Sequence, residues 1–175
     1  KIDFFRLCGG SLGGKARGLA FARSMIKYSD IQNEFKDTVI RVPSSAVIGT
    51  NEFDNFMKDN QLWEIALEYS DNKKLEKAFL KAHLSIDLML RLESFIQDHK
   101  YPLAVRSSSL LEDSQYQPLS GAYETIMLPN NSKITKKRLS ELVKAIKRVF
   151  ASTFKGEAKL LLQSTSHRIE EEKMA

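Results

Sequence analysis

The sequence of 175 residues has little cysteine, proline or glycine, no low-complexity tract and no long hydrophobic run. Its one cysteine, Cys8, cannot form an internal disulfide, which fits a reducing cytoplasm, and a catalytic thiol would need a histidine partner. No apolar stretch approaches the ~20 residues of a membrane-spanning helix, so we expect no membrane partner. The chain has neither an apolar signal core nor an initiating methionine, and we therefore expect it to be a piece of a longer chain.

The residues that are present have the composition of an ordinary globular protein, with 42% hydrophobic and 28% charged residues. The chain is long enough for one domain or two small lobes with a real core. Lys and Arg total 27 against 22 Asp and Glu, which gives a net charge of +5. This excess suits an anionic partner, but both signs are mixed along the chain, so nucleic acid is not implied.

The order of predicted helices and strands is mixed and favours an α+β fold. Apolar residues at helical spacing predict helices over 15–28, 62–69, 73–82 and 157–166, and a long helix from residue 135. Two further helices are expected after capping residues, one starting near residue 52 after Thr50 and one after Ser85. We expect strands in two short pieces of 38–50, at 102–106 and at 122–128. Residues 1–7 make a poor buried parallel strand, because charged residues interrupt them.

A glycine-rich motif, GGSLGGKA, covers residues 9–16. Its spacing matches the phosphate-binding loop G-x-x-x-x-G-K, but Ala16 lacks the hydroxyl that holds Mg²⁺ there, so we reject a P-loop. The glycines still permit close backbone approach, and Lys15 lies at a predicted helix N-terminus, which favours an anion. The alternative is a flexible turn beside a solvated lysine.

A second motif, VRSSSLLEDS, covers residues 105–114. Arg106 ends a short apolar strand, which would hold its guanidinium group rigidly and suits bidentate contact with phosphate oxygens. The serines after it offer hydroxyl donors. The alternative is that Arg106 only pairs with Glu112 or Asp113.

A third motif, PLSGAYET, covers residues 118–125. Gly121 precedes a predicted strand and permits a bulge or a close approach by a ligand. Thr125 would share a strand face with Tyr123, opposite Glu124. The alternative is that these polar strand residues face water.

Taken together, four segments resemble the ATP-grasp domain of phosphoenolpyruvate synthases, pyruvate phosphate dikinases and rifampicin phosphotransferases. They are LGGKARGLAF, VPSSAVIGTNEFDNFM, PLAVRSSSLLEDS and QPLSGAYETIMLPNN. The resemblance runs from about Leu12 to Phe154, with PLSG where relatives often have SFAG. It implies the first half of an ATP-grasp domain, a mixed sheet with flanking helices that is incomplete without its second half. Residues 1–175 would then be the N-terminal part of that domain.

The resemblance also implies a set of site residues. In that family the lysine of GGK and the arginine of VRS contact the ATP phosphates, which corresponds to Lys15 and to Arg106, the latter in a catalytic role. Gly13, Gly14 and Thr125 would lie beside the nucleotide. We therefore expect Lys15 and Arg106 to lie close together and to face one cleft.

The family reaction moves phosphate from ATP to a histidine on a separate swivelling domain, and from there to pyruvate. ATP and Mg²⁺ are thus the implied ligands, and the Mg²⁺-binding carboxylates would belong to the second ATP-grasp half, outside this chain. His83, His99 and His167 match no phosphohistidine motif. The isolated chain is expected to be inactive without those partner domains.

Two other functions stay open. A regulatory module could keep the fold and sense nucleotide without turnover. A nucleic-acid binder is the weakest reading, because its basic residues are expected on the solvent face of the last long helix, with no aromatic stacking platform among them. These basic residues are Lys133, Lys136, Lys137, Arg138, Lys144, Lys147 and Arg148.

Overall fold

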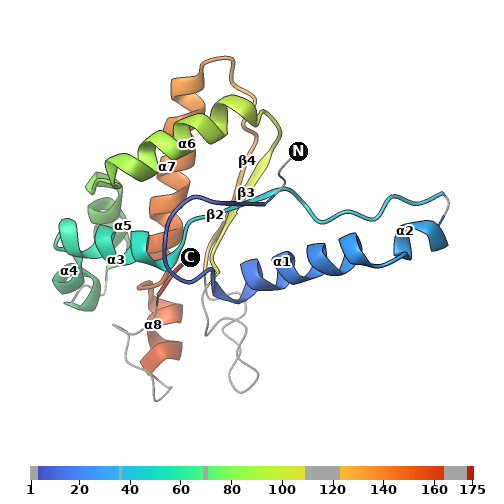
Figure 1. Ribbon diagram of the computed structural model, residues 1–175. Coiled ribbons are helices and arrows are strands. Elements are labelled where there is room, and N and C mark those ends of the chain that lie inside the picture. The colour runs from blue at the N-terminus through green and yellow to red at the C-terminus, as the bar shows by residue number, and fades with distance from the viewer. Residues whose placement is uncertain (1–3, 36, 69–70, 109–122, 164–172) are drawn as a thin grey trace.

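A computed structural model describes residues 4–35, 37–68, 71–108, 123–163 and 173–175 (Figure 1). The elements are, in order, β1 (Phe4–Arg6), α1 (Gly13–Tyr28), α2 (Ile31–Glu34), β2 (Ser45–Val47), α3 (Thr50–Asp59), α4 (Leu62–Glu68), α5 (Asn72–Lys81), α6 (Ile86–Asp98), β3 (Leu103–Arg106), β4 (Thr125–Leu128), α7 (Thr135–Ser152) and α8 (Gly156–Gln163). Helices dominate and the strands are short. The predicted α+β class is confirmed.

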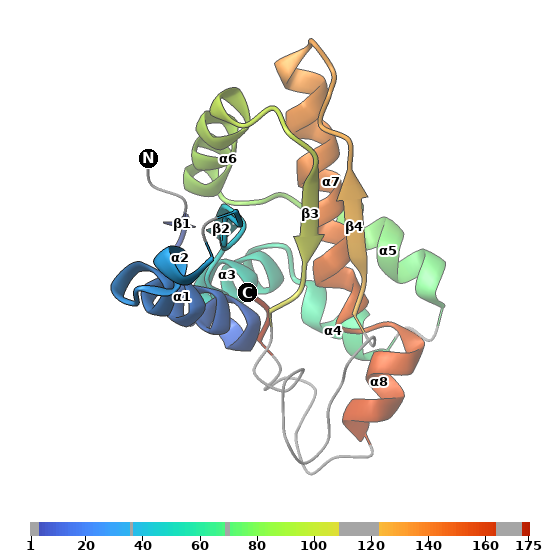
Figure 2. The same ribbon diagram turned by 90° about the vertical axis from the view of Figure 1, so that its right-hand side faces the viewer.

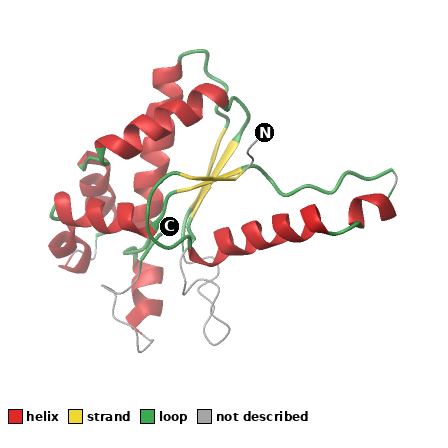
Figure 3. Cartoon of the chain, in the orientation of Figure 1, coloured by secondary structure: helices red, strands yellow, loops and turns green. Residues whose placement is uncertain are grey.

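The strands form two separate two-stranded sheets. β1 pairs with β2 in parallel, and β3 pairs with β4 in antiparallel fashion, with Leu103 opposite Leu128 and Arg106 opposite Thr125. Figure 3 shows the four strands at the centre of the molecule, between the group of helices and α1. Both pairing types of the expected mixed sheet are therefore present, but in two sheets.

The hydrophobic core surrounds α7, which packs against α5, α6 and both strands of the β3–β4 sheet. Figure 2 shows this sheet lying over α7. The helix predicted from residue 135 is confirmed, and its apolar stripe is buried, including Leu142, Ile146, Val149 and Phe150. Phe150 packs edge-on against Phe53 of α3, with ring centroids 5.2 Å apart. Aromatic packing of this kind fixes the position of α7 beneath the sheet.

α1 projects away from this core (Figure 1). Its buried residues are Gly13 and Ala16, both in the first turn. Met25 is 54% exposed and Phe21 is 67% exposed. The helix is therefore fastened to the molecule at its N-terminal end, the end that carries Lys15.

Two predictions around residues 38–50 were wrong. Of the two expected strand pieces only β2 forms, and residues 38–44, all of them described, lie outside any strand. Thr50 does not cap α3, because Gly49 occupies the N-cap position and Thr50 is the first helical residue. The Thr50 hydroxyl instead accepts a hydrogen bond from the Ser11 N–H at 2.9 Å. This bond joins the start of α3 to the glycine-rich loop.

The start of the chain also differs from the prediction. Charged residues made 1–7 a poor candidate for a buried parallel strand, yet Phe4–Arg6 pairs in parallel with β2. The strand is only half-buried and Arg6 is exposed, so the charge stays in water. The Arg6 guanidinium donates to the carbonyls of Cys8 and Gly10, at 3.1 and 2.5 Å, and so holds the loop that follows.

Arg138 was predicted on the solvent face of the long helix, and this was wrong. It is 4% exposed. Its Nη1 atom donates to the carbonyls of Ile96 at 2.7 Å and His99 at 3.1 Å, at the C-terminal end of α6. The last carbonyls of a helix lack partners within the helix, and a cation beside them is stabilising. Arg138 therefore caps α6 and joins it to α7.

Candidate functional site

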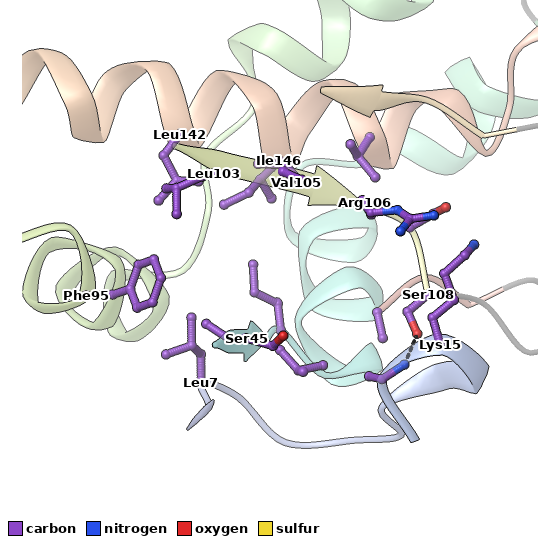
Figure 4. Close-up of a pocket in the computed structure, with 18 of the residues that line it drawn as sticks. Leu7, Lys15, Ser45, Phe95, Leu103, Val105, Arg106, Ser108, Leu142 and Ile146 are labelled. Carbon is purple, nitrogen blue, oxygen red and sulfur yellow. Dashed lines mark hydrogen bonds between the residues drawn. The ribbon is translucent and has the colours of Figure 1, made fainter. Parts of the chain in front are cut away.

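A cavity of about 650 Å³ lies between β2, β3, α7 and the first turn of α1. Its walls are mainly apolar and include Leu7, Val47, Phe95, Leu103 and Ile146. Lys15 and Arg106 also line it, and Figure 4 shows both cations at one end, with Phe95 and Leu103 toward the other. The cavity is thus apolar along most of its length and cationic at one end.

Lys15 owes its position to the glycine loop before it. Gly13 has a φ of +70°, and a Cβ atom there would stand 1.7 Å from the carbonyl oxygen of Ser108. Only glycine fits both this backbone conformation and this close approach. Gly14 follows as the second residue of α1. The predicted close approach of the loop is therefore present, and its neighbour on this side is the chain after β3.

Arg106 ends β3, where the strand alternates between two faces. Leu103 and Val105 pack against the core, whereas Arg106 is exposed. Thr125, the first residue of β4, lies directly opposite Arg106 in the register and is exposed as well. Directly opposed residues of an antiparallel pair point to the same face of the sheet. Arg106 and Thr125 are therefore neighbours on one face of the sheet.

The structure brings together some of the predicted site residues and sets others beside them. Within the described part of the chain, the cavity lining includes Lys15 and Arg106 and leaves out Gly13, Gly14 and Thr125. The expectation that Lys15 and Arg106 face one cleft is met by this geometry. What they bind stays a prediction.

Several residues named in the sequence analysis fall outside the described residues, and His167 is one of them. Glu112 and Asp113, the alternative partners of Arg106, lie there, and so does Gly121.

Ser108 makes a contact that the sequence did not reveal. Its motif indicated only that the serines after Arg106 offer hydroxyl donors. In the structure the Ser108 hydroxyl accepts from the Ala16 N–H at 3.1 Å and donates to the Leu12 carbonyl at 2.9 Å, both at the start of α1. Nothing local in the sequence indicates this contact, because its partners are 92 and 96 positions away.

Two other groups with chemical potential have structural surroundings. Burial raises the pKa of the Cys8 thiol to about 11, and the nearby carboxylates of Glu52 and Asp87 add to the shift. The thiol is therefore protonated at neutral pH and is not an activated nucleophile. The His99 ring stacks on Phe95, with centroids 4.2 Å apart, and its Nδ1 lies 2.8 Å from the Phe95 carbonyl oxygen.

Among the described residues, no group of three or more His, Cys, Asp or Glu side chains could hold a metal ion. The location of Mg²⁺ ligands outside this chain stays a prediction. None of the described helices has the length and apolar character needed to cross a bilayer.

Comparison with protein families gives one match, over residues 10–175. The matching family is described as the AMP/ATP-binding domain of pyruvate phosphate dikinase. The matched region includes the glycine loop, both cations at the cavity and β4. No curated protein and no solved structure matches the chain significantly.

Proposed function

We propose that this chain, which belongs to the family of pyruvate phosphate dikinase AMP/ATP-binding domains, is the N-terminal nucleotide-binding lobe of a phosphotransferase. That phosphotransferase would resemble phosphoenolpyruvate synthase. Family membership supports the binding of ATP or AMP. The finer proposal is that phosphate passes from ATP through a phosphohistidine to pyruvate or a similar acceptor. The phosphohistidine domain, the second ATP-grasp half and Mg²⁺ are its proposed partners, and the cytoplasm is its proposed location.

The observation that carries this proposal is the meeting of Lys15 and Arg106 at one end of the cavity (Figure 4). The two residues come from the start of a helix and the end of a strand, far apart in the sequence. Two cations on separate, anchored elements suit a ligand with several negative charges along its length, such as a chain of phosphates. A single phosphate or carboxylate would need only one of them.

Each cation has a distinct proposed role. The planar guanidinium of Arg106 would contact two phosphate oxygens at once and hold the charge that develops on the transferred group. Lys15 would neutralise a neighbouring phosphate as a point charge, next to the positive end of the α1 dipole. Thr125 would add a hydroxyl beside Arg106. Mg²⁺, when bound, would supply further neutralisation of phosphate charge, from ligands that we place outside this chain.

The test is ATP affinity in the full-length protein with Lys15→Ala and Arg106→Ala. Loss of one charged hydrogen-bonding contact removes about 1.5–3 kcal/mol, so we expect affinity to fall roughly tenfold to a hundredfold for each variant. Lys27→Ala is the matched control, since Lys27 is an exposed lysine in the last turn of the same helix. Unchanged ATP affinity in both cavity variants would contradict the proposal. ATP binding without any phosphoryl transfer by the intact protein would favour the nucleotide-sensing alternative.

A further inference from the structure

Ser108 joins the two parts of the chain that carry the cavity cations. We propose that it is a positioning residue, which sets the separation between Lys15 and Arg106 so that both contact one phosphate chain. This inference rests on the proposed function, because it assigns those two cations to a polyphosphate. The hydroxyl itself is not assigned to the ligand.

The Ser108 hydroxyl joins two backbone groups at the start of α1. Ser108 is 7% exposed, and its Oγ lies between the Ala16 N–H and the Leu12 carbonyl (Figure 4 shows the bond to Ala16). These are the backbone groups that the first i to i−4 hydrogen bond of an α-helix joins. Lys15 lies between them in the sequence. A shift of the Ser108 hydroxyl therefore shifts the turn that carries Lys15.

Ser108 is also connected to Arg106 through the backbone. Ser108 follows the end of β3 by two residues, so its backbone continues directly from the residue that holds the guanidinium. Its N–H donates to the Ala175 carbonyl at 2.9 Å, which gives the segment a second hydrogen bond besides those to α1. Met174, beside Ala175, is fully buried in the core. Ser108 is thus anchored to the body of the molecule while its hydroxyl holds α1.

Ser108 contacts both of the buried residues of α1. These residues are Gly13 and Ala16, and the helix beyond them projects outward (Figure 1). Gly13 packs against the Ser108 carbonyl, and the Ala16 N–H donates to the Ser108 hydroxyl. Both buried residues of the helix therefore contact the same serine. Loss of the hydroxyl leaves the position of Lys15 relative to Arg106 less defined.

The consequence differs between ligands of different length. Inorganic triphosphate can span both cations, whereas inorganic phosphate occupies one of them. Only the longer ligand depends on the separation of the cations, because two contacts formed together require a matched geometry. Ser108→Ala is therefore expected to weaken triphosphate binding about tenfold and to leave phosphate binding unchanged.

The experiment measures both affinities by titration of the full-length protein, together with the melting temperature. Ser85→Ala is the matched control, because the Ser85 hydroxyl likewise serves a helix start, accepting from the Leu88 N–H at 3.1 Å in α6. We expect it to lower the melting temperature and to keep triphosphate affinity. Ser108→Thr, which retains the hydroxyl, should restore most of the triphosphate affinity.

The outcomes separate this inference from the proposed function. A folded Ser108→Ala protein with wild-type triphosphate affinity, or with equal losses for triphosphate and phosphate, overturns the positioning role. Wild-type triphosphate affinity in both Lys15→Ala and Arg106→Ala overturns the proposed function instead. If Ser108→Ala does not fold, Ser108→Cys is measured in its place, since a thiol keeps the volume and weakens both hydrogen bonds.

Discussion

Arg106 is the single residue whose chemistry most limits what can replace it. It ends β3 opposite Thr125 and lines the cavity with Lys15. Lysine at this position would keep the charge but lose the planar fork, so a bidentate phosphate contact would become a single one. In the proposed function, bidentate contact with the transferred group would stabilise the transition state as well as the bound nucleotide.

We expect Arg106→Lys in the full-length protein to lower ATP-dependent phosphoryl transfer roughly tenfold to a hundredfold, as loss of about 1.5–3 kcal/mol implies. The loss should fall on turnover more than on ATP affinity, because in the proposed function Arg106 would hold charge that develops during transfer. Turnover, ATP affinity and melting temperature are measured together. Arg91→Lys is the control, since Arg91 is an exposed arginine that pairs with Asp87 within α6. A mutant that melts early but keeps its turnover would make Arg106 a scaffold residue.

Single residues also show what the sequence could and could not predict. Lys15 and Arg106 were selected from short motifs and from the family resemblance that these motifs carry, and both line one cavity. The roles of Ser108 and Arg138 were not predicted, because they depend on backbone groups up to 96 and 42 positions away. Helical periodicity assigned Arg138 to solvent, since periodicity ignores partners on other elements. Contacts between distant segments are thus where sequence reasoning failed.

At the scale of elements, a group of charges holds the lead-in to β4. Arg148 and Lys155 pair with Glu76 of α5 and with Glu124, the residue before β4. The Glu124 N–H also donates to the Ser152 hydroxyl at 3.1 Å. Glu124 directly precedes Thr125, which lies opposite Arg106. This network therefore fixes the end of the sheet at which Arg106 lies.

The network predicts a pH-dependent contribution to stability. The hydrogen bond from Lys155 holds the pKa of Glu76 below its ordinary value, with the charges of Lys155 and Arg148 acting in the same direction against partial burial. A carboxyl with a lowered pKa stabilises the fold above its unfolded pKa, and this contribution is lost as pH falls through the folded value. We expect Glu76→Gln to destabilise the protein by roughly 1 kcal/mol at pH 7, as is typical of partly exposed pairs.

The same substitution should have little effect once the pH is below the folded pKa of Glu76, because the wild-type carboxyl is then neutral too. Urea unfolding at neutral and acidic pH measures the difference between wild type and Glu76→Gln. Glu93→Gln, at an exposed position of α6, is the control and should change stability little at either pH. A destabilisation by Glu76→Gln that is equal at both pH values would refute the ion-pair explanation.

The elements themselves were largely predictable where helical spacing was long and regular. The α7 stripe and the Ser85 cap of α6 were both found in advance. The failures were short elements whose stability comes from a partner. β1 forms because it pairs with β2. Thr50 does not cap α3, and its hydroxyl accepts a hydrogen bond from the Ser11 N–H instead. A strand of three residues has too few side chains to reveal its pairing in the sequence.

In the whole molecule, the candidate site lies at a junction between two differently anchored parts. One part is the helical body, in which α7 and an aromatic core support the β3–β4 sheet and Arg106 (Figure 2). The other part is α1, fastened at its first turn and carrying Lys15. Neither part alone presents two cations to one ligand. The site is therefore a property of the junction, and the Ser108 contact lies within it.

This arrangement predicts that the chain of residues 1–175 alone binds ATP weakly. Two charged contacts of about 1.5–3 kcal/mol each total roughly 3–6 kcal/mol, and a Kd of about 1 mM corresponds to about 4 kcal/mol. One lobe leaves the base and the metal largely in water, so we expect affinity near the millimolar range and no phosphoryl transfer. The proposed full-length protein, with the second lobe in place, should bind at least tenfold more tightly. Calorimetric titration of both proteins with ATP, with and without Mg²⁺, makes the comparison, and tight, Mg²⁺-dependent binding by residues 1–175 alone would show that this chain is a complete nucleotide site.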